Sequence, residues 1–185
     1  MKKMENGCAP DALDIYKAFG DLAADTLFWK LIFLNSALFG TPNRQDVKQK
    51  LLSQSRAGEA LIHTYYTLPA ADRLIELADV HNRLFVIYVE RSAARRPALR
   101  ESTHRQWEEN GRRIARLLPQ LNPFWKQPEW NAMIAHQIQL LTTIAQGTLE
   151  GQYAVFTTTA PLCQRLAVEM AEYMAAGVIA DPSFA

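Results

Sequence analysis

The residues best suited to chemistry are two histidines, His81 and His136, which each fall on the apolar side of a long predicted helix. Imidazoles from facing helices bind transition metals inside helical bundles when carboxylates complete the ligand set, and Asp25 could supply one of these. The competing interpretation is a pair of partly buried histidines held by hydrogen bonds. Because the spacing defines no acidic partner, the sequence favours this second interpretation.

Two shorter spacings also match known patterns. Glu101 and His104 have the Glu-x-x-His spacing of carboxylate-bridged di-iron bundles, but such sites need a second copy and further glutamates, which the sequence does not show. Glu59 and His63 share one helix face, where a surface ion pair explains them at least as well. We therefore assign no metal site to either pair.

Arginines concentrate between residues 91 and 116. They are Arg91, Arg95, Arg96, Arg100, Arg105, Arg112, Arg113 and Arg116. With His104 and Trp107 nearby, they could bind phosphates or single-stranded nucleic acid by charge and stacking. Glutamates are interspersed among them, and arginines at successive turns cannot all face one way. A solvated, salt-bridged tip of a helical hairpin is therefore the favoured interpretation.

Other catalytic patterns are missing from the sequence. It contains no glycine-rich phosphate loop, CxxC pair or HExxH motif. Cys163 has no histidine near it in sequence and is far from Cys8, so both cysteines are predicted to be reduced thiols of a cytoplasmic protein. A net charge of +1 gives no general attraction to nucleic acid or to anionic membranes. No cofactor is identified.

Length and hydropathy predict one helical domain. The 185 residues suit a single domain over 10–180, with a disordered N-terminal tail at 1–9 and a short tail at 181–185. The first residues lack the apolar segment of a signal peptide. The strongest apolar run, 27–39, contains Lys30 and Asn35 and is too short to cross a membrane, so a cytoplasmic location is predicted.

Six helices are predicted to position these residues. They run from Asp11 to Phe39, from Asn43 or Asp46 to just before Pro69, from Pro69–Asp72 to about Arg95, from Pro97 to Leu121, from Pro128 to Glu150 and from Gln152 to Ile179. Each shows apolar residues at helical spacing, with glycine or proline near its ends. A break within 53–58 and bends at Pro119 and Pro161 are expected. Because no strand is predicted, the fold class is an all-α bundle of about six helices.

A corner at 122–125 joins the two parts of the chain. Pro123 ends one helix, and Pro128 suits the first turn of the next. The aromatic residues at this corner are expected to pack in the core, and they are Phe124, Trp125 and Trp130.

The chain also shows a loose internal similarity. A shift of 55 residues superposes Thr26, His81 and His136, and three repeated helical hairpins would follow from it. Apolar helices align easily with one another, so a true repeat and a chance match both stay open.

Several segments together resemble an uncharacterised bacterial family of small all-helical proteins. They are Thr26-Leu-Phe-Trp, Trp107-Glu-Glu-Asn, Ile114-Ala-Arg-Leu-Leu, Leu121-Asn-Pro-Phe-Trp and Ala175-Ala-Gly-Val-Ile. Names given to that family, such as acetylglutamate kinase or glycosyltransferase, have no visible basis in these residues. The resemblance covers roughly residues 20 to 180 and bears on fold rather than activity.

The resemblance implies a metal or polar-ligand site that this chain has altered. His81 and His136 match two of the three histidines of the family pattern, but Thr26 stands at the first of the three positions. Arg112 and Arg113 stand where the family pattern has acidic residues, which reverses the local charge. The chain is then a divergent member that has lost a metal or moved to an anionic ligand near Arg112 and Arg113.

The leading functional prediction is a non-enzymatic helical bundle that binds a small ligand or a partner helix in its interior or groove. Its predicted ligand-binding residues are His81, His136, Trp29 and Tyr88. A degenerate ferritin-like metalloprotein using His81, His136 and Asp25 is the alternative. Anion or nucleic-acid binding by the arginine-rich hairpin is a weaker one. A homodimer that buries an apolar face is also open.

Overall fold

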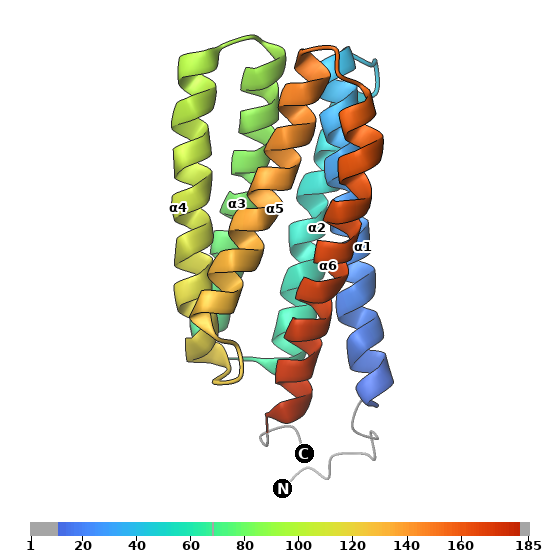
Figure 1. Ribbon diagram of the computed structural model, residues 1–185. Helices are drawn as coiled ribbons and strands as arrows, with labels where there is room; N and C mark the ends of the chain where they lie inside the picture. Colours follow the sequence, from blue (N-terminus) through green and yellow to red (C-terminus); the bar gives the residue numbers. More distant parts are fainter. Residues whose placement is uncertain (1–10, 68, 182–185) are drawn as a thin grey trace, which may run out of the picture.

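The computed structural model describes residues 11–67 and 69–181, which form six α-helices and no strand (Figure 1). The helices are α1 (Ala12–Phe39), α2 (Arg44–Tyr65), α3 (Pro69–Ala93), α4 (Pro97–Leu121), α5 (Gln127–Leu149) and α6 (Ala154–Ala180). The all-α bundle of about six helices is thereby confirmed. The tails predicted at 1–9 and 181–185 lie outside the described residues, apart from Asp181.

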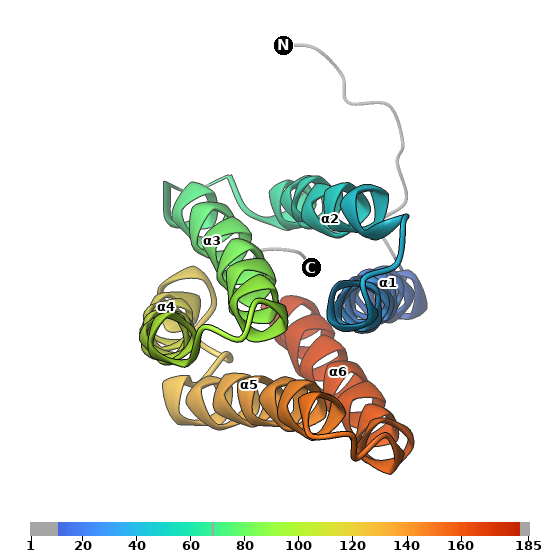
Figure 2. The same cartoon turned by 90° about the horizontal axis from the view of Figure 1, so that it is seen from above.

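Successive helices run up and down and pack against one another in order around the bundle (Figure 2). α1 packs along α6, which closes the ring, and α3 also reaches both α1 and α5 across the interior. The chain therefore forms three consecutive helical hairpins, α1–α2, α3–α4 and α5–α6. This arrangement places one face of every helix toward a shared core.

The first helix begins and ends as its sequence predicts. The side chain of Asp11 accepts a hydrogen bond from the Leu13 backbone N–H at 3.4 Å, which caps the N-terminus. At the other end Gly40 adopts a left-handed conformation with φ of 69° and donates its N–H to the Ser36 carbonyl. A residue without a Cβ is suited to that conformation, so Gly40 fixes the C-terminus of α1.

One helix, α2, is more continuous than predicted, and two others keep their predicted extent around an internal proline. α2 runs unbroken through the polar stretch 53–58, because it packs against α1 on one side and α3 on the other. α4 continues past Pro119, which stands in its last turn, and the Asn122 N–H still donates to the Leu118 carbonyl. α6 likewise contains Pro161, with α1 and α5 packed along its length. In α2, tertiary packing outweighs the weak helix preference of the polar stretch.

The corner at 122–125 is held by hydrogen bonds to α6. The Asn122 side chain donates to the Gly177 carbonyl and the Tyr66 hydroxyl, both at 2.8 Å, and Trp125 Nε1 donates to the Met174 carbonyl at 3.1 Å. A Cβ at Gly177 would lie 1.9 Å from Trp125 Nε1, so this close approach requires glycine. Trp125 and Trp130 are buried as predicted.

One prediction at the corner is wrong. Phe124 is 44% exposed instead of packed in the core, because the turn that buries Trp125 directs its neighbour outward.

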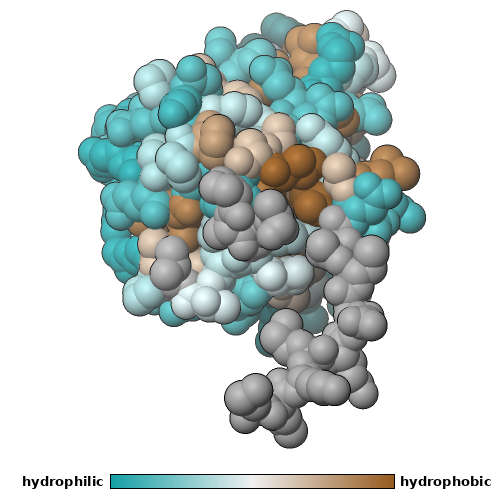
Figure 3. Space-filling model, turned by 90° about the horizontal axis from the view of Figure 1, so that it is seen from below, coloured by the Kyte–Doolittle hydropathy of each residue, from teal (hydrophilic) through white to brown (hydrophobic). Residues whose placement is uncertain are grey.

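The outer surface bears on two further predictions. At the end where α1 begins and α6 ends, hydrophilic residues form most of the surface and hydrophobic ones gather near its middle (Figure 3). Leu13 and Ile179 are exposed hydrophobic residues of these two helix ends. Among the described residues, α1 alone is long and apolar enough to cross a membrane, a property that core helices share. The homodimer and the cytoplasmic location stay predictions.

Candidate functional site

A cavity of about 250 Å³ lies at the centre of the bundle, and all six helices contribute to its lining. A second lobe of about 210 Å³ shares part of the same walls, including Lys30 and Trp130. We call the two lobes together the central cavity. Its apolar walls come chiefly from Phe19, Leu22, Ile62, Leu74, Ile114, Leu118, Ile134, Met170 and Met174.

Small residues leave part of this space unfilled. Gly58 of α2 and Ala78 of α3 both line the cavity. A Cβ added at Gly58 would meet only the Leu22 side chain, at the ordinary contact distance of 3.8 Å. The helices therefore meet at the centre without enough side-chain volume to close it, although cores otherwise reach crystal-like packing density.

Lys30 is the unusual residue of the cavity wall. It is 4% exposed, and it makes no hydrogen bond or ion pair with any described residue. Its Nζ lies 5.9 Å from the centre of the Phe85 ring. Burial lowers the pKa of Lys30 to about 8, because the apolar surroundings disfavour the charged amine. The cavity therefore contains a cationic group that lacks a partner of opposite charge within the described protein.

Other polar side chains also line the cavity, and two of them carry donors that are poorly satisfied. Trp130 Nε1 is buried and has no hydrogen-bond partner among the described residues. Gln137 Nε2 donates only to the Met170 sulfur, at 3.7 Å, which is a weak interaction. Glu59 is the one exposed residue of the lining and therefore stands at the solvent side. The cavity wall thus includes two donors, Trp130 Nε1 and Gln137 Nε2, that lack a strong acceptor among the described residues.

His81 is held in place on both sides of its ring. Trp107 Nε1 donates to His81 Nε2 at 2.9 Å, so Nδ1 carries the proton and donates to Asn110 Oδ1 at 3.1 Å. Burial and the nearby charge of Lys30 lower the pKa of His81 to about 3. His81 is therefore neutral at ordinary pH, and neither nitrogen is free to bind a metal.

The three residues predicted to bind a metal do not converge. His136 is exposed, so its expected place on the apolar side of α5 is wrong, and Asp25 is exposed on α1. Within the part of the chain that the structure describes, no three His, Cys, Asp or Glu residues form a group able to hold a metal ion. Of these three residues, His81 alone lies in the interior, and the internal repeat stays a prediction.

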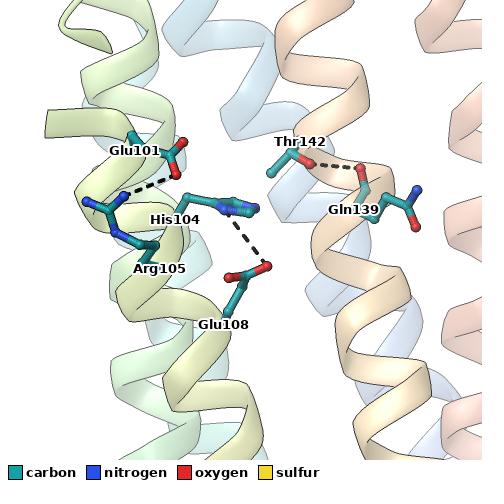
Figure 4. Close-up of polar contacts among 6 residues, drawn as sticks. All are labelled: Glu101, His104, Arg105, Glu108, Gln139 and Thr142. Atoms are coloured by element: carbon teal, nitrogen blue, oxygen red, sulfur yellow. Dashed lines mark hydrogen bonds and ion pairs between the residues drawn. The ribbon is translucent and has the colours of Figure 1, made fainter. Parts of the chain in front are cut away.

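His136 instead lines a surface groove between α4 and α5, which Figure 4 shows in part. His104 Nδ1 lies 3.9 Å from Glu108 Oε1, and Glu101 lies 3.5 Å from Arg105. On the facing helix the Thr142 hydroxyl donates to the Gln139 backbone carbonyl. The Glu-x-x-His pair is thus engaged with neighbours on its own helix, which agrees with its interpretation as a polar helix surface.

The two aromatic residues predicted to bind a ligand lie elsewhere. Trp29 packs edge-on against Phe28, and Lys50 Nζ lies 5.8 Å from its ring. Tyr88 is buried beside Trp107 and His104. Neither residue lines the central cavity, so His81 is the only predicted ligand-binding residue that does.

The arginines that gather in space differ from those singled out in the sequence. Arg112 and Arg113 are exposed, and Arg112 pairs with Glu109 at 2.9 Å. A hollow of about 410 Å³ instead lies beside the α3–α4 turn and the end of α5, and we call it the arginine hollow. It is lined by Arg91, Arg95, Arg96 and Arg100, together with Ser92, Pro97, Gln146, Leu149 and Glu150.

The arginine hollow carries uncompensated charge. None of its arginines forms an ion pair with a described carboxylate, although Glu150 stands in the same wall. Arg91 donates to the Leu99 carbonyl and to the Thr103 hydroxyl, which fixes one guanidinium in place. This hollow, rather than Arg112 and Arg113, is where the chain could receive an anion.

Lys30 was the functional candidate missed from the sequence. In the sequence, Lys30 is a single charged residue that interrupts the apolar run 27–39. Its spacing from Leu27 and Leu34 places it on the same buried stripe of α1, and that spacing was the available signal.

Comparison of the chain with protein-family models, with curated proteins and with solved structures gives no significant match. The resemblance to a bacterial family of helical proteins therefore stays a prediction.

Proposed function

We propose that this protein binds a small, largely apolar molecule in the central cavity and does not transform it. The observation that carries the proposal is a cavity at the centre of the bundle, lined by all six helices and mainly apolar. Sites for small molecules are typically concave and apolar, with a few polar groups that orient the ligand.

The energetics of the cavity favour an occupant. The apolar side chains of the cavity wall leave surface without close-packed neighbours, and this surface lacks the dispersion contacts of a filled core. A ligand that fills the cavity restores these contacts without requiring the helices to collapse. Binding would therefore stabilise the folded state by an amount that grows with the logarithm of the ratio of ligand concentration to Kd.

The polar groups present support binding rather than catalysis. His81 is neutral with both nitrogens engaged, so it is poorly placed to move a proton. Burial raises the pKa of the Cys163 thiol to about 11, and the thiolate needed for nucleophilic attack is therefore disfavoured. No nucleophile with an adjacent base lines the described cavity.

Titration with a neutral fluorescent probe, 1-aminoanthracene, tests this proposal. We expect saturable binding, with a rise in melting temperature as the probe is added. Ala78→Met places a longer side chain in the cavity and should weaken probe binding at least tenfold. Ala57→Met is the matched control, because Ala57 lies exposed on α2 outside the cavity.

Two results would contradict the proposal. The first is the absence of saturable probe binding to the wild-type protein. The second is equal probe affinity in Ala78→Met and the wild type, which would place the probe at the surface. Circular dichroism of each variant establishes that the helical fold is retained before affinities are compared.

The arginine hollow supports a second candidate function, the binding of a small phosphorylated anion. Its four guanidinium groups surround one hollow without ion pairs to described carboxylates, and guanidinium is well matched to phosphate oxygens. The test is calorimetric titration with pyrophosphate at low and moderate salt. Arg95→Gln/Arg96→Gln should abolish the heat of binding, whereas Arg112→Gln/Arg113→Gln should preserve it. The opposite pattern would restore the site expected from the sequence.

A further inference from the structure

We infer that the ligand of the central cavity is an amphipathic carboxylic acid whose carboxylate binds Lys30. The inference rests on the proposed function, since it names the class of molecule that the same cavity receives. It depends on the charge and hydrogen-bonding needs of the cavity wall, which an entirely apolar ligand would leave unmet.

The first need is a counter-charge for Lys30. A buried ammonium without a partner is costly, and the proteins that bury one usually pair it or neutralise it. The groups near Lys30 on facing helices do not provide a negative charge. His81 on α3 is neutral, Phe85 offers only its ring face, and burial keeps the Cys163 thiol on α6 protonated. A ligand carboxylate would supply the missing charge.

The second need is an acceptor for another donor. Trp130 Nε1 on α5 is buried without a hydrogen-bond partner among the described residues, and Trp130 lines both lobes together with Lys30. A carboxylate can accept hydrogen bonds from both donors and also supplies the negative charge, which an alcohol or a single carbonyl does not. Thr26, one turn before Lys30 on α1, lines the same two lobes and adds a hydroxyl.

The rest of the cavity fits an apolar tail. A cavity of roughly 150 Å³ lined by aliphatic and aromatic residues is enough to hold benzene. The larger lobe alone measures about 250 Å³, which leaves room for an alkyl chain of medium length. Glu59 at the solvent side would repel a carboxylate there, so the negative end of the ligand belongs inside, at Lys30.

A matched pair of ligands tests the inference, octanoate and octanol, which differ chiefly in the carboxylate. Both are measured by displacement of the neutral probe at pH 7. We expect octanoate to bind the wild type at least tenfold more tightly than octanol. In Lys30→Met this preference should disappear while the probe still binds. Lys17→Met, an exposed lysine on the same helix, is the control and should keep the preference.

The pH dependence of the preference for octanoate over octanol provides a second test. Lys30 loses its positive charge as the pH rises above about 8. The preference for octanoate should therefore shrink at least fivefold between pH 7 and pH 10, while octanol affinity stays constant. Lys30→Arg, which keeps its charge at pH 10, should retain any octanoate preference that it shows at pH 7.

The possible failures can be told apart. If the neutral probe binds but octanoate displaces it no better than octanol, the inference is wrong and the proposed function stands. The inference is also wrong if Lys30→Met keeps the preference for octanoate. If neither the probe nor either ligand binds the wild type, the proposed function itself is wrong.

Discussion

The central cavity and the arginine hollow present positive charge in opposite settings. In the cavity, one amine lies among apolar side chains contributed by all six helices. In the hollow, four guanidinium groups lie at the end of the bundle, where Arg95 and Arg96 are exposed to water. Water screens the second set, so their mutual repulsion costs little, whereas burial makes the single amine costly.

This difference means that the number of charges is a poor guide to a site. The arginines are conspicuous in the sequence, yet an exposed cluster can exist without a ligand because solvent satisfies it. Lys30 is one residue in an apolar run, yet its unpaired amine calls for an acceptor that the described chain does not supply. The buried charge therefore carries more information about a ligand than the exposed cluster.

Acid is expected to affect the interior most strongly. The pKa of His81 is lowered from 6.5 in the unfolded chain to about 3 in the folded protein. Between these pH values the unfolded chain therefore binds a proton that the folded protein does not bind. The stability contribution of neutral His81 is complete above pH 6.5 and is lost as the pH falls toward 3. We expect a loss of roughly 5 kcal/mol from this residue over that interval. Urea unfolding at several pH values measures how the free energy of unfolding changes with pH.

A matched pair of variants isolates His81 from other acid-sensitive groups. Between pH 4 and 6.5, the free energy of unfolding of His81→Gln should depend less steeply on pH than that of the wild type. The difference in slope should correspond to about one proton fewer taken up on unfolding, whatever the stability of the variant at neutral pH. His136→Gln should keep the wild-type slope, because His136 is exposed at the surface groove. Equal slopes in all three proteins would show that His81 is not buried in its neutral form.

Removal of the charge of Lys30 should have the next largest effect on the free energy of unfolding, and it should stabilise the protein. The pKa of Lys30 is lowered from 10.5 to about 8, so the unfolded chain binds more protons between these values and stability rises with pH across them. Below pH 8 the burial of the charged amine costs roughly 3 kcal/mol in the ligand-free protein. Lys30→Met should recover most of that energy at pH 7.

The measurement is the free energy of unfolding at pH 7 and pH 10.5. The free energy of unfolding of Lys30→Met should exceed that of the wild type at pH 7, and this difference in free energy should be smaller at pH 10.5. Lys48→Met, which removes a partly exposed lysine paired with Glu90 at 2.8 Å, should instead be neutral or slightly destabilising. A destabilised Lys30→Met would indicate that the amine has a partner within the folded chain.

The sequence predicted the helices well because local chemistry determines their ends. Asp11 and Gly40 cap α1, and Pro97 begins α4, as their residue types require. The unbroken α2 was not predictable in the same way, because its polar middle is stabilised by α1 and α3 rather than by its own sequence.

The site was less predictable because burial depends on which face of a helix meets the core. His136 is flanked on the helix surface by Ala132, Ala135 and Gln139, all of which are exposed. These small and polar residues lie on the outer face of α5. The face is hard to recognise in the sequence because the other faces of the helix are strongly apolar. His81 was correctly placed in the interior. Its engagement with Trp107 and Asn110 could not be read from the sequence, since these partners lie on another helix.

Substitutions in the arginine hollow are expected to change stability least. They provide the control for the comparison between exposed arginines and the buried Lys30. Arg95→Gln/Arg96→Gln should change the free energy of unfolding by less than about 0.5 kcal/mol, with a slight gain at low salt where repulsion is weakly screened. That gain should vanish at high salt, whereas the gain from Lys30→Met should persist, because the cost of the buried amine is chiefly desolvation, which salt screens much less. Urea unfolding at both salt concentrations measures the two variants together. A loss above about 1 kcal/mol at the hollow would mean that its guanidinium groups stabilise the helix ends by binding their carbonyls. The arginines would then be structural elements of the fold, and the second candidate function would lose its basis.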